Sequence, residues 1–202
     1  MSCNPGQRAD LPEGVWAIAS HANSLQQVDD FISSAETAAC WCWRRPQLTG
    51  AQQQLSLKKL TAIKPVFTHG LFDWAAACSA SGVICGVNSL PPSMVLELHS
   101  DLFVGASVHS LAEAKVAIAA GVHFLLYGPV YDTPSKQDFL SARGLDALSE
   151  VAASGIPVVA LGGIEEPAQV EALQHHGAHS VAVLRASRDA SLMRELCAAF
   201  VS

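Results

Sequence analysis

Short apolar segments rich in β-branched residues alternate with amphipathic segments along almost the whole chain. The apolar segments are predicted strands, and they lie at residues 15–19, 38–43, 65–68, 82–87, 102–107, 123–128, 157–163 and 180–185. Those of the second half are continuously apolar, which is typical of strands buried on both faces of a parallel sheet. Eight strand–helix units share 202 residues, so the spacing predicts a single α/β domain, a (β/α)8 TIM barrel of near-minimal length.

The segments between the predicted strands carry helix start and stop signals. In residues 110–121, Ser110 and Glu113 have the spacing of a capping box, and the segment ends in glycine, as helix C-termini often do. Residues 144–155 and 165–177 follow the same pattern. An open, doubly wound sheet is the alternative fold, but it usually carries a glycine-rich turn after its first strand, and none is present here.

The domain organisation follows from this alternation. The barrel domain is predicted to span residues 14–202, and residues 1–13 are predicted to be a loose leader. Neither a sequence repeat nor a low-complexity segment is evident in the chain. The whole chain is therefore expected to fold around one core.

Composition argues against several classes of function. A net charge of −6 and a pI near 5.7 offer no basic stripe for nucleic acid. No run of about 18 apolar residues suggests a membrane span, and the N-terminus lacks a signal-peptide core. The six cysteines lack zinc-finger spacing and are interpreted as small buried hydrophobes in a reducing cytoplasm. We expect a cytoplasmic protein without nucleic-acid or membrane partners, and a homo-oligomer is compatible with the sequence.

In a barrel of this kind, the functional site lies where strands end and lead into helices. The candidate residues are those that follow the predicted strands, namely Arg44, His69, Ser107, His109, Thr133, Ser135, Lys136, Gly162, Gly163 and Arg185. His69 and His109 titrate near neutral pH and are the predicted proton carriers. A structural role in hydrogen bonding is the alternative for each histidine.

The loops after the sixth, seventh and eighth strands predict an anion site. Gly162 and Gly163 allow backbone N–H groups to approach a phosphate just before a helix. The loop with Thr133, Ser135 and Lys136 adds two hydroxyls and an ammonium. Arg185 either supplies a further cation to the phosphate or occupies its place. A tight turn at the glycines and a solvated surface loop are the alternatives.

The stretches VGASVHSLAEAKVAIAAGVHFLLYGPVYDTPSK, RGLDALSEVAASGIPVVALGGI and HSVAVLRA resemble the thiamine phosphate synthase and thiazole tautomerase family. The resemblance covers residues 102–186 in order and spacing, whereas the first hundred residues match mainly in the rhythm of their strands. It implies a (β/α)8 barrel that binds a thiazole phosphate at the glycine turn and at the loop after the eighth strand. In the synthases it also implies a Mg2+-bound pyrimidine pyrophosphate.

Several residues fall on the motifs of that family. The strand-5 serine of the family corresponds to Ser107, its phosphate glycines to Gly162 and Gly163, and its Thr-Pro-Thr-Lys pyrophosphate loop to Thr133, Ser135 and Lys136. Arg44 matches the arginine of a Gln-x-Arg-x-Lys motif, although Cys42 and Pro46 replace its glutamine and lysine. By this resemblance the listed residues contact the ligand.

Other positions depart from the family. His69-Gly70 stands where the synthases have Asn-Asp, and Asn88-Ser89 stands where they have a second aspartate. Both magnesium carboxylates are therefore missing, so no metal ligands are assigned and Mg2+ is doubtful as a cofactor. Pro129 occupies the position of the tautomerase histidine, and Arg185 replaces a serine of the phosphate cradle. Neither catalytic set is complete.

These observations predict a diverged member of the family that binds a small phosphorylated heterocycle of the thiazole type. Such a protein would be a thiamine phosphate synthase-like transferase or a thiazole tautomerase-like isomerase. A non-catalytic phosphate-ligand-binding or partner protein on the same barrel is the alternative from another class. A phosphosugar isomerase on the same fold is a third hypothesis.

Overall fold

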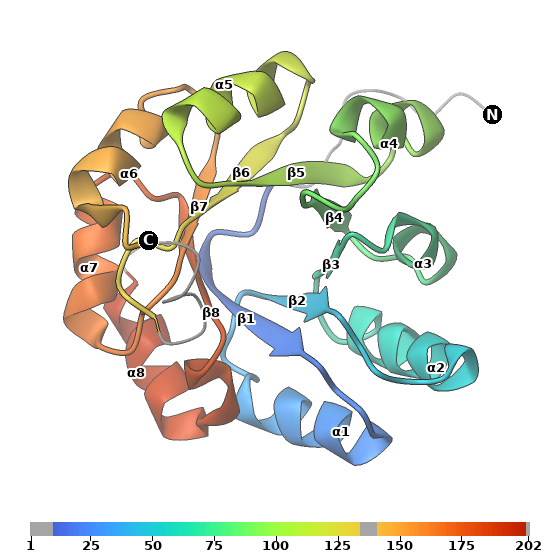
Figure 1. Cartoon of the computed structure of the whole chain (residues 1–202). Coiled ribbons are helices and arrows are strands. Elements are labelled where there is room, and N and C mark those ends of the chain that lie inside the picture. Colours follow the sequence, from blue (N-terminus) through green and yellow to red (C-terminus); the bar gives the residue numbers. More distant parts are fainter. Residues whose placement is uncertain (1–9, 134–140, 201–202) are drawn as a thin grey trace.

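The computed structural model describes residues 10–133 and 141–200. Eight parallel strands form a closed barrel in chain order (Figure 1). They are β1 (Gly14–Ser20), β2 (Cys40–Arg44), β3 (Val66–His69), β4 (Gly82–Cys85), β5 (Phe103–Val108), β6 (Phe124–Tyr127), β7 (Val158–Leu161) and β8 (Ser180–Val183). Each predicted strand is present, so the prediction of a single (β/α)8 barrel is confirmed.

Helices surround the ring of strands (Figure 1). They are α1 (Leu25–Ser34), α2 (Gly50–Thr61), α3 (Phe72–Ala77), α4 (Pro92–Leu98), α5 (Leu111–Ala119), α6 (Gly144–Ala152), α7 (Pro167–His175) and α8 (Ala190–Ala199), with the short 3-10 helix η2 (Ala186–Arg188) after β8. Among the described residues, no helix is long and apolar enough to cross a membrane.

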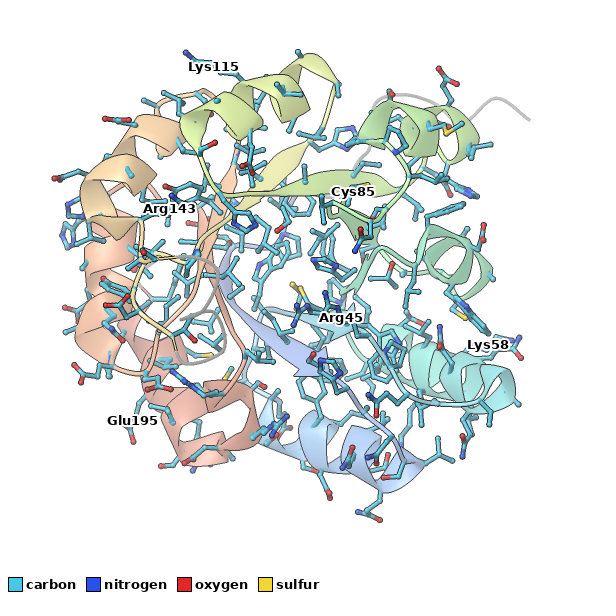
Figure 2. The ribbon with its side chains drawn as sticks, viewed as in Figure 1. Arg45, Lys58, Cys85, Lys115, Arg143 and Glu195 are labelled. Atoms are coloured by element: carbon cyan, nitrogen blue, oxygen red, sulfur yellow. The ribbon has the colours of Figure 1, made fainter. Side chains whose placement is uncertain are left out.

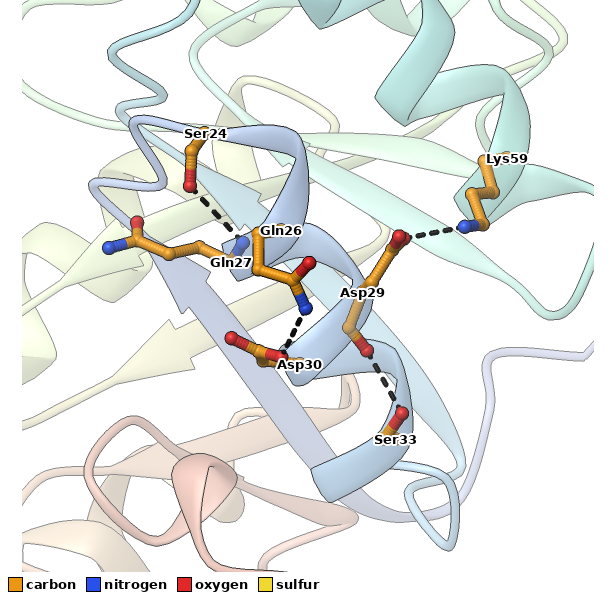
Figure 3. A network of polar contacts seen from close by, with 7 residues as sticks. All are labelled: Ser24, Gln26, Gln27, Asp29, Asp30, Ser33 and Lys59. Atoms are coloured by element: carbon orange, nitrogen blue, oxygen red, sulfur yellow. Dashed lines mark hydrogen bonds and ion pairs between the residues drawn. The ribbon is translucent and has the colours of Figure 1, made fainter.

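Local capping explains where several helices begin. The side chain of Ser24 accepts a hydrogen bond from the N–H of Gln27 at the start of α1 (Figure 3). A separate ion pair joins α1 to α2, because Lys59 Nζ lies 2.5 Å from a carboxylate oxygen of Asp29.

At the start of α5, Ser110 accepts from the N–H of Glu113, as predicted. The carboxylate of Glu113, however, accepts from the N–H of His109 at 2.8 Å. One of the two hydrogen bonds of the predicted capping box is therefore present. In the other, the Glu113 carboxylate binds the N–H of His109 and not the N–H of Ser110.

Aromatic side chains fill the lower half of the barrel interior. The ring of Trp16 stacks on Phe67 at 4.6 Å between centroids, and Phe124 meets both rings edge-on at 5.6 and 5.5 Å. Glycine makes room for them, because a Cβ added to Gly105 would lie 2.3 Å from the Phe124 ring. The outward faces of the same strands pack against the helices in a separate, larger core.

Residues just before β1 cover this lower end. Leu11 is buried with the interior cluster, and the carbonyl of Pro12 accepts hydrogen bonds from Trp16 Nε1 at 2.8 Å and Ser180 Oγ at 3.0 Å. Leu11 and Pro12 therefore contact the barrel. The predicted loose leader at residues 1–13 stays a prediction, and its residues 1–9 lie outside the described residues.

Candidate functional site

A cavity of about 370 Å3 opens at the C-terminal ends of the strands. Its floor is apolar and consists of interior residues from six strands, namely Ile18, Cys42, Ile84, Leu126, Leu161 and Ala182. Burial raises the pKa of the Cys42 thiol to about 12, so this thiol is neutral near neutral pH. The floor therefore offers an uncharged surface to a ligand.

The cavity brings together residues that lie far apart in the sequence. Of the predicted site residues, it is lined by Arg44, His69, Ser107, Thr133, Gly162, Gly163 and Arg185. Ser135 and Lys136 lie outside the described residues. The roles assigned to all of these residues in binding or catalysis stay predictions.

The structure places His109 elsewhere. This residue follows β5 and is not among the residues that line the cavity. Its ring Nδ1 is hydrogen-bonded to the carbonyl oxygen of Gly128, and its N–H donates to Glu113. His109 thus has the structural contacts of the alternative role, and its position does not support the predicted catalytic one.

Arg44 and His69 lie on one level of the barrel wall. The strand register pairs Ser20 with Arg44 and Arg44 with His69, so the three residues form a row across β1, β2 and β3. Arg44 Nη1 lies 3.5 Å from Ser20 Oγ, at the limit of a hydrogen bond. Burial and the positive charge of Arg45 lower the pKa of Arg44. Arg44 and Arg45 therefore place two guanidinium groups on the side of the cavity next to β2.

A missing side chain gives the ring of His69 its space. A Cβ added to Gly86, just after β4, would lie 3.1 Å from His69 Cε1. The ring thus packs over a glycine while it also lines the cavity. His69 therefore presents an imidazole, a common general acid–base group, to the cavity.

The glycine turn after β7 fits closely against the loop after β6. Gly162 and Gly163 have φ values of +107° and +70°. A Cβ added to Gly163 would lie 2.5 Å from the carbonyl oxygen of Asp132, and one added to Gly162 would lie 2.6 Å from Pro129 Cα. Glycine is therefore required by the turn itself, whatever ligand the turn meets.

Arg185 is held at the rim of the cavity by an ion pair. Its Nε lies 2.5 Å from a carboxylate oxygen of Glu165, and both side chains are about half exposed. Gln169 fixes the loop after β7 that carries Glu165. Its side chain donates to the carbonyl of Gly163 and accepts from the N–H groups of Glu165 and Glu166. Arg185 thus lines the cavity with part of its charge already balanced.

The cavity is cationic. Its described lining includes four arginines and two histidines and no carboxylate. Three of these basic residues were not among the predicted site residues, namely His21, Arg45 and Arg188. His21 and Arg45 directly follow β1 and β2, so the rule that strand ends carry the site was sufficient to find them. Arg188 required knowledge of the short helix η2.

The cavity does not fit a divalent cation of the kind that the sequence resemblance implies. Within residues 10–133 and 141–200, no group of three or more His, Cys, Asp or Glu side chains could hold a metal ion. The end of β3 presents His69-Gly70 and the segment after β4 presents Asn88-Ser89, so carboxylates are absent from these positions. Mg2+ prefers anionic oxygen ligands, and the described lining of this cavity offers none.

Comparison with known proteins decides the family. The sequence model described as thiamine monophosphate synthase matches residues 21–187. The chain belongs to the thiamine monophosphate synthase family. It is 36% identical to the thiamine-phosphate synthase of Methanococcus maripaludis over 134 residues. This alignment covers 64% of the present chain and 63% of that protein. It is also 32% identical over 159 residues to the thiamine-phosphate synthase of Geobacillus kaustophilus, which covers 75% and 72% of the two chains.

A solved structure of this family has the same fold. The thiamine phosphate pyrophosphorylase of Pyrococcus furiosus superposes with a TM-score of 0.80 at 25% identity, and the match covers 94% of this chain and 96% of that one. The predicted resemblance to the thiamine phosphate synthase family is therefore confirmed. The alignment with the M. maripaludis protein spans less than two thirds of that protein.

Proposed function

We propose that this chain binds a phosphorylated, thiazole-type heterocycle in the cavity at the C-terminal ends of the strands. The lining carries the proposal, since a neutral, apolar floor lies below four arginines and two histidines. The floor suits the apolar face of a ring, and the cationic rim suits its phosphate. Membership of the thiamine monophosphate synthase family supports a thiazole phosphate as the ligand.

The phosphate is proposed to bind at the Gly162–Gly163 turn beside Arg185. Backbone N–H groups that precede a helix suit an anion, and α7 begins shortly after this turn. Lys136, outside the described residues, remains a candidate for the same role. This arrangement leaves the ring of the ligand near Ser107 and His69, which line the same cavity.

His69 is the proposed proton carrier, because it lines the cavity and His109 does not. In a proton shift within the heterocycle, His69 takes a proton from one ring atom and returns it to another. This step balances without a metal ion or a second substrate. We therefore favour an isomerase of the thiazole tautomerase type over a Mg2+-dependent transferase.

The test combines two measurements. Calorimetry measures the binding of thiazole phosphate, and NMR follows the turnover of its tautomers. We expect His69→Ala to bind the ligand within about threefold of the wild-type protein and to lose turnover. His109→Ala is the matched control and should keep both. Equal turnover in His69→Ala and wild type would refute the role of His69, and absence of binding to the wild type would refute the proposed function.

A non-catalytic binding protein is the second candidate. The observation in its favour is that Pro129, which cannot transfer a proton, lines the cavity where the resemblance implies a catalytic histidine. Binding of thiazole phosphate without turnover in the wild type would establish it.

A reducing, cytoplasmic location is also proposed. The five cysteines of the described residues are free thiols, which supports this location.

A further inference from the structure

A tight turn over residues 86–89 follows β4. The strand itself ends at Cys85, which Figure 2 labels. Ser89 binds both polar backbone groups of Gly86. The N–H of Gly86 donates to Ser89 Oγ, and the carbonyl of Gly86 accepts from the N–H of Ser89, each at 2.9 Å. Serine hydroxyls often close turns in this way, and here the serine fixes the backbone of Gly86 on both sides.

The centre of this turn has no packing of its own. Its two middle residues, Val87 and Asn88, are exposed, and the side chain of Val87 is 98% exposed. Buried side chains at the centre of the turn therefore do not hold it in shape. The two hydrogen bonds to Ser89 do.

Ser89 also lies against the residue that follows His69. Gly70 has a φ of +72°, and a Cβ added to it would lie 2.9 Å from Ser89 Oγ. The N–H of Gly70 donates to the carbonyl of Ile84 in β4 at 2.9 Å. The hydroxyl of Ser89 thus lies where the end of β3 and the turn after β4 meet.

The ring of His69 depends on the other end of the turn for its position. Rotation of a histidine ring about its bond to Cβ has broad energy wells, so packing has to fix the plane of the ring. A Cβ added to Gly86 would lie 3.1 Å from His69 Cε1 and 3.9 and 4.0 Å from the two ring nitrogens. The corner of the ring between its nitrogens therefore points at Gly86, and a shift of Gly86 would move both nitrogens within the cavity.

We propose that Ser89 is a positioning residue for His69. Its hydroxyl holds Gly86 in place, and Gly86 sets where the imidazole lies. Proton transfer requires a ring nitrogen within hydrogen-bond reach of the reacting atom, and a displacement of about 1 Å can slow a reaction by about a hundredfold. The inference rests on the proposed function, because it concerns the same proton carrier. It adds a residue that is not among those that line the cavity.

The first measurement is of kcat and KM for the thiazole phosphate tautomers. We expect Ser89→Ala to lower kcat by about ten- to a hundredfold and to change KM by less than about twofold, because the ligand contacts remain while the ring is misplaced. Ser89→Thr keeps the hydroxyl and should stay within about threefold of the wild type in both constants. Gly86→Ala should lower kcat by pushing the ring away. Ser93→Ala, at an exposed serine of α4, is the matched control and should change neither constant.

The second measurement reports on the ring without turnover. In proton–carbon NMR spectra, the Cε1–H signal of His69 is identified by its absence from His69→Ala. We expect this signal to shift in Ser89→Ala and to keep its wild-type position in Ser89→Thr and Ser93→Ala. Thermal melting by circular dichroism checks that each variant is folded.

An unchanged His69 signal in folded Ser89→Ala would overturn the inference, and so would a loss of kcat that folded Ser89→Thr does not recover. The two proposals fail separately. Turnover that depends on His69 and not on Ser89 refutes this inference alone. Absence of turnover in the wild type, together with a His69 signal that shifts in Ser89→Ala, refutes the proposed isomerase and upholds the support of the ring by Ser89.

Discussion

In both the lower and the upper half of the barrel, alternate residues of each strand point into the interior. The lower half is filled by these side chains, whereas the upper half encloses a cavity. In the lower half, Trp16, Phe67 and Phe124 pack against one another and leave Gly105 no room for a side chain. In the upper half, the inward residues are small, aliphatic or cationic, and a cavity of about 370 Å3 remains. The packed aromatic core and the candidate ligand cavity therefore lie at different levels along the axis of the barrel.

Phe124→Ala is expected to have the largest effect. It removes a fully buried ring from the lower half, and such truncations lower the free energy of unfolding by about 3–5 kcal/mol. Denaturant unfolding measures the loss, with Val116→Ala, at a side chain that is 72% exposed, as the control. Affinity of the folded variant for thiazole phosphate should stay at the wild-type level. A matching loss of affinity would show that the two halves are coupled.

Arg44→Gln tests the upper half in the same way. Burial and the charge of Arg45 both lower the pKa of Arg44 and so disfavour its charged form. Replacement of Arg44 by glutamine should therefore leave the melting temperature unchanged or raise it. Affinity for thiazole phosphate should fall by about ten- to a hundredfold, because Arg44 lines the cavity and hydrogen bonds to charged groups contribute about 1.5–3 kcal/mol. Calorimetry and thermal melting measure the two effects. A large loss of stability would contradict the separation of roles.

Gly163→Ala and Gly144→Ala form a matched pair. Both glycines have positive φ, +70° and +78°, but a Cβ at Gly163 would meet the Asp132 carbonyl at 2.5 Å, whereas nothing lies within 4 Å at Gly144. Gly144→Ala should therefore lose only about 1 kcal/mol of unfolding free energy for the backbone conformation, and Gly163→Ala should lose about 1–3 kcal/mol more by crowding. Denaturant unfolding compares them. Equal losses would show that the glycine turn yields easily.

Sequence patterns predicted the barrel well because each strand is a run of apolar residues buried on both sides. The strand-end rule also located Arg44, His69, Ser107 and the glycine turn at one cavity. It placed His109 there as well, because His109 follows shortly after the predicted fifth strand, which ends at Ser107. The strand β5 ends at Val108, however, so alternation no longer holds at the next residue, and the ring bonds to Gly128 instead.

Other features of the site depend on tertiary structure. Arg188 reaches the cavity because η2 turns the chain back after β8, and the Arg185–Glu165 pair joins two different loops. No local pattern in the sequence encodes either contact. The apolar floor and the cationic rim could likewise be recognised as one surface only after the barrel had closed.

Glu165→Gln is expected to have the smallest effect and decides the role of Arg185. The carboxylate of Glu165 lies 2.5 Å from Arg185 Nε at the rim, so a bound phosphate competes with it for the same guanidinium. Half-exposed pairs of this kind contribute about 0.2–1 kcal/mol, and removal of the carboxylate should raise the affinity for thiazole phosphate by about two- to fivefold. The gain should shrink in high salt, because ions screen exposed charges. Calorimetry at two salt concentrations measures it, with Glu195→Gln, on the outside of the molecule (Figure 2), as the control. A weaker affinity would mean that Glu165 orients Arg185 toward the phosphate, so that the ion pair belongs to the binding site and does not oppose it.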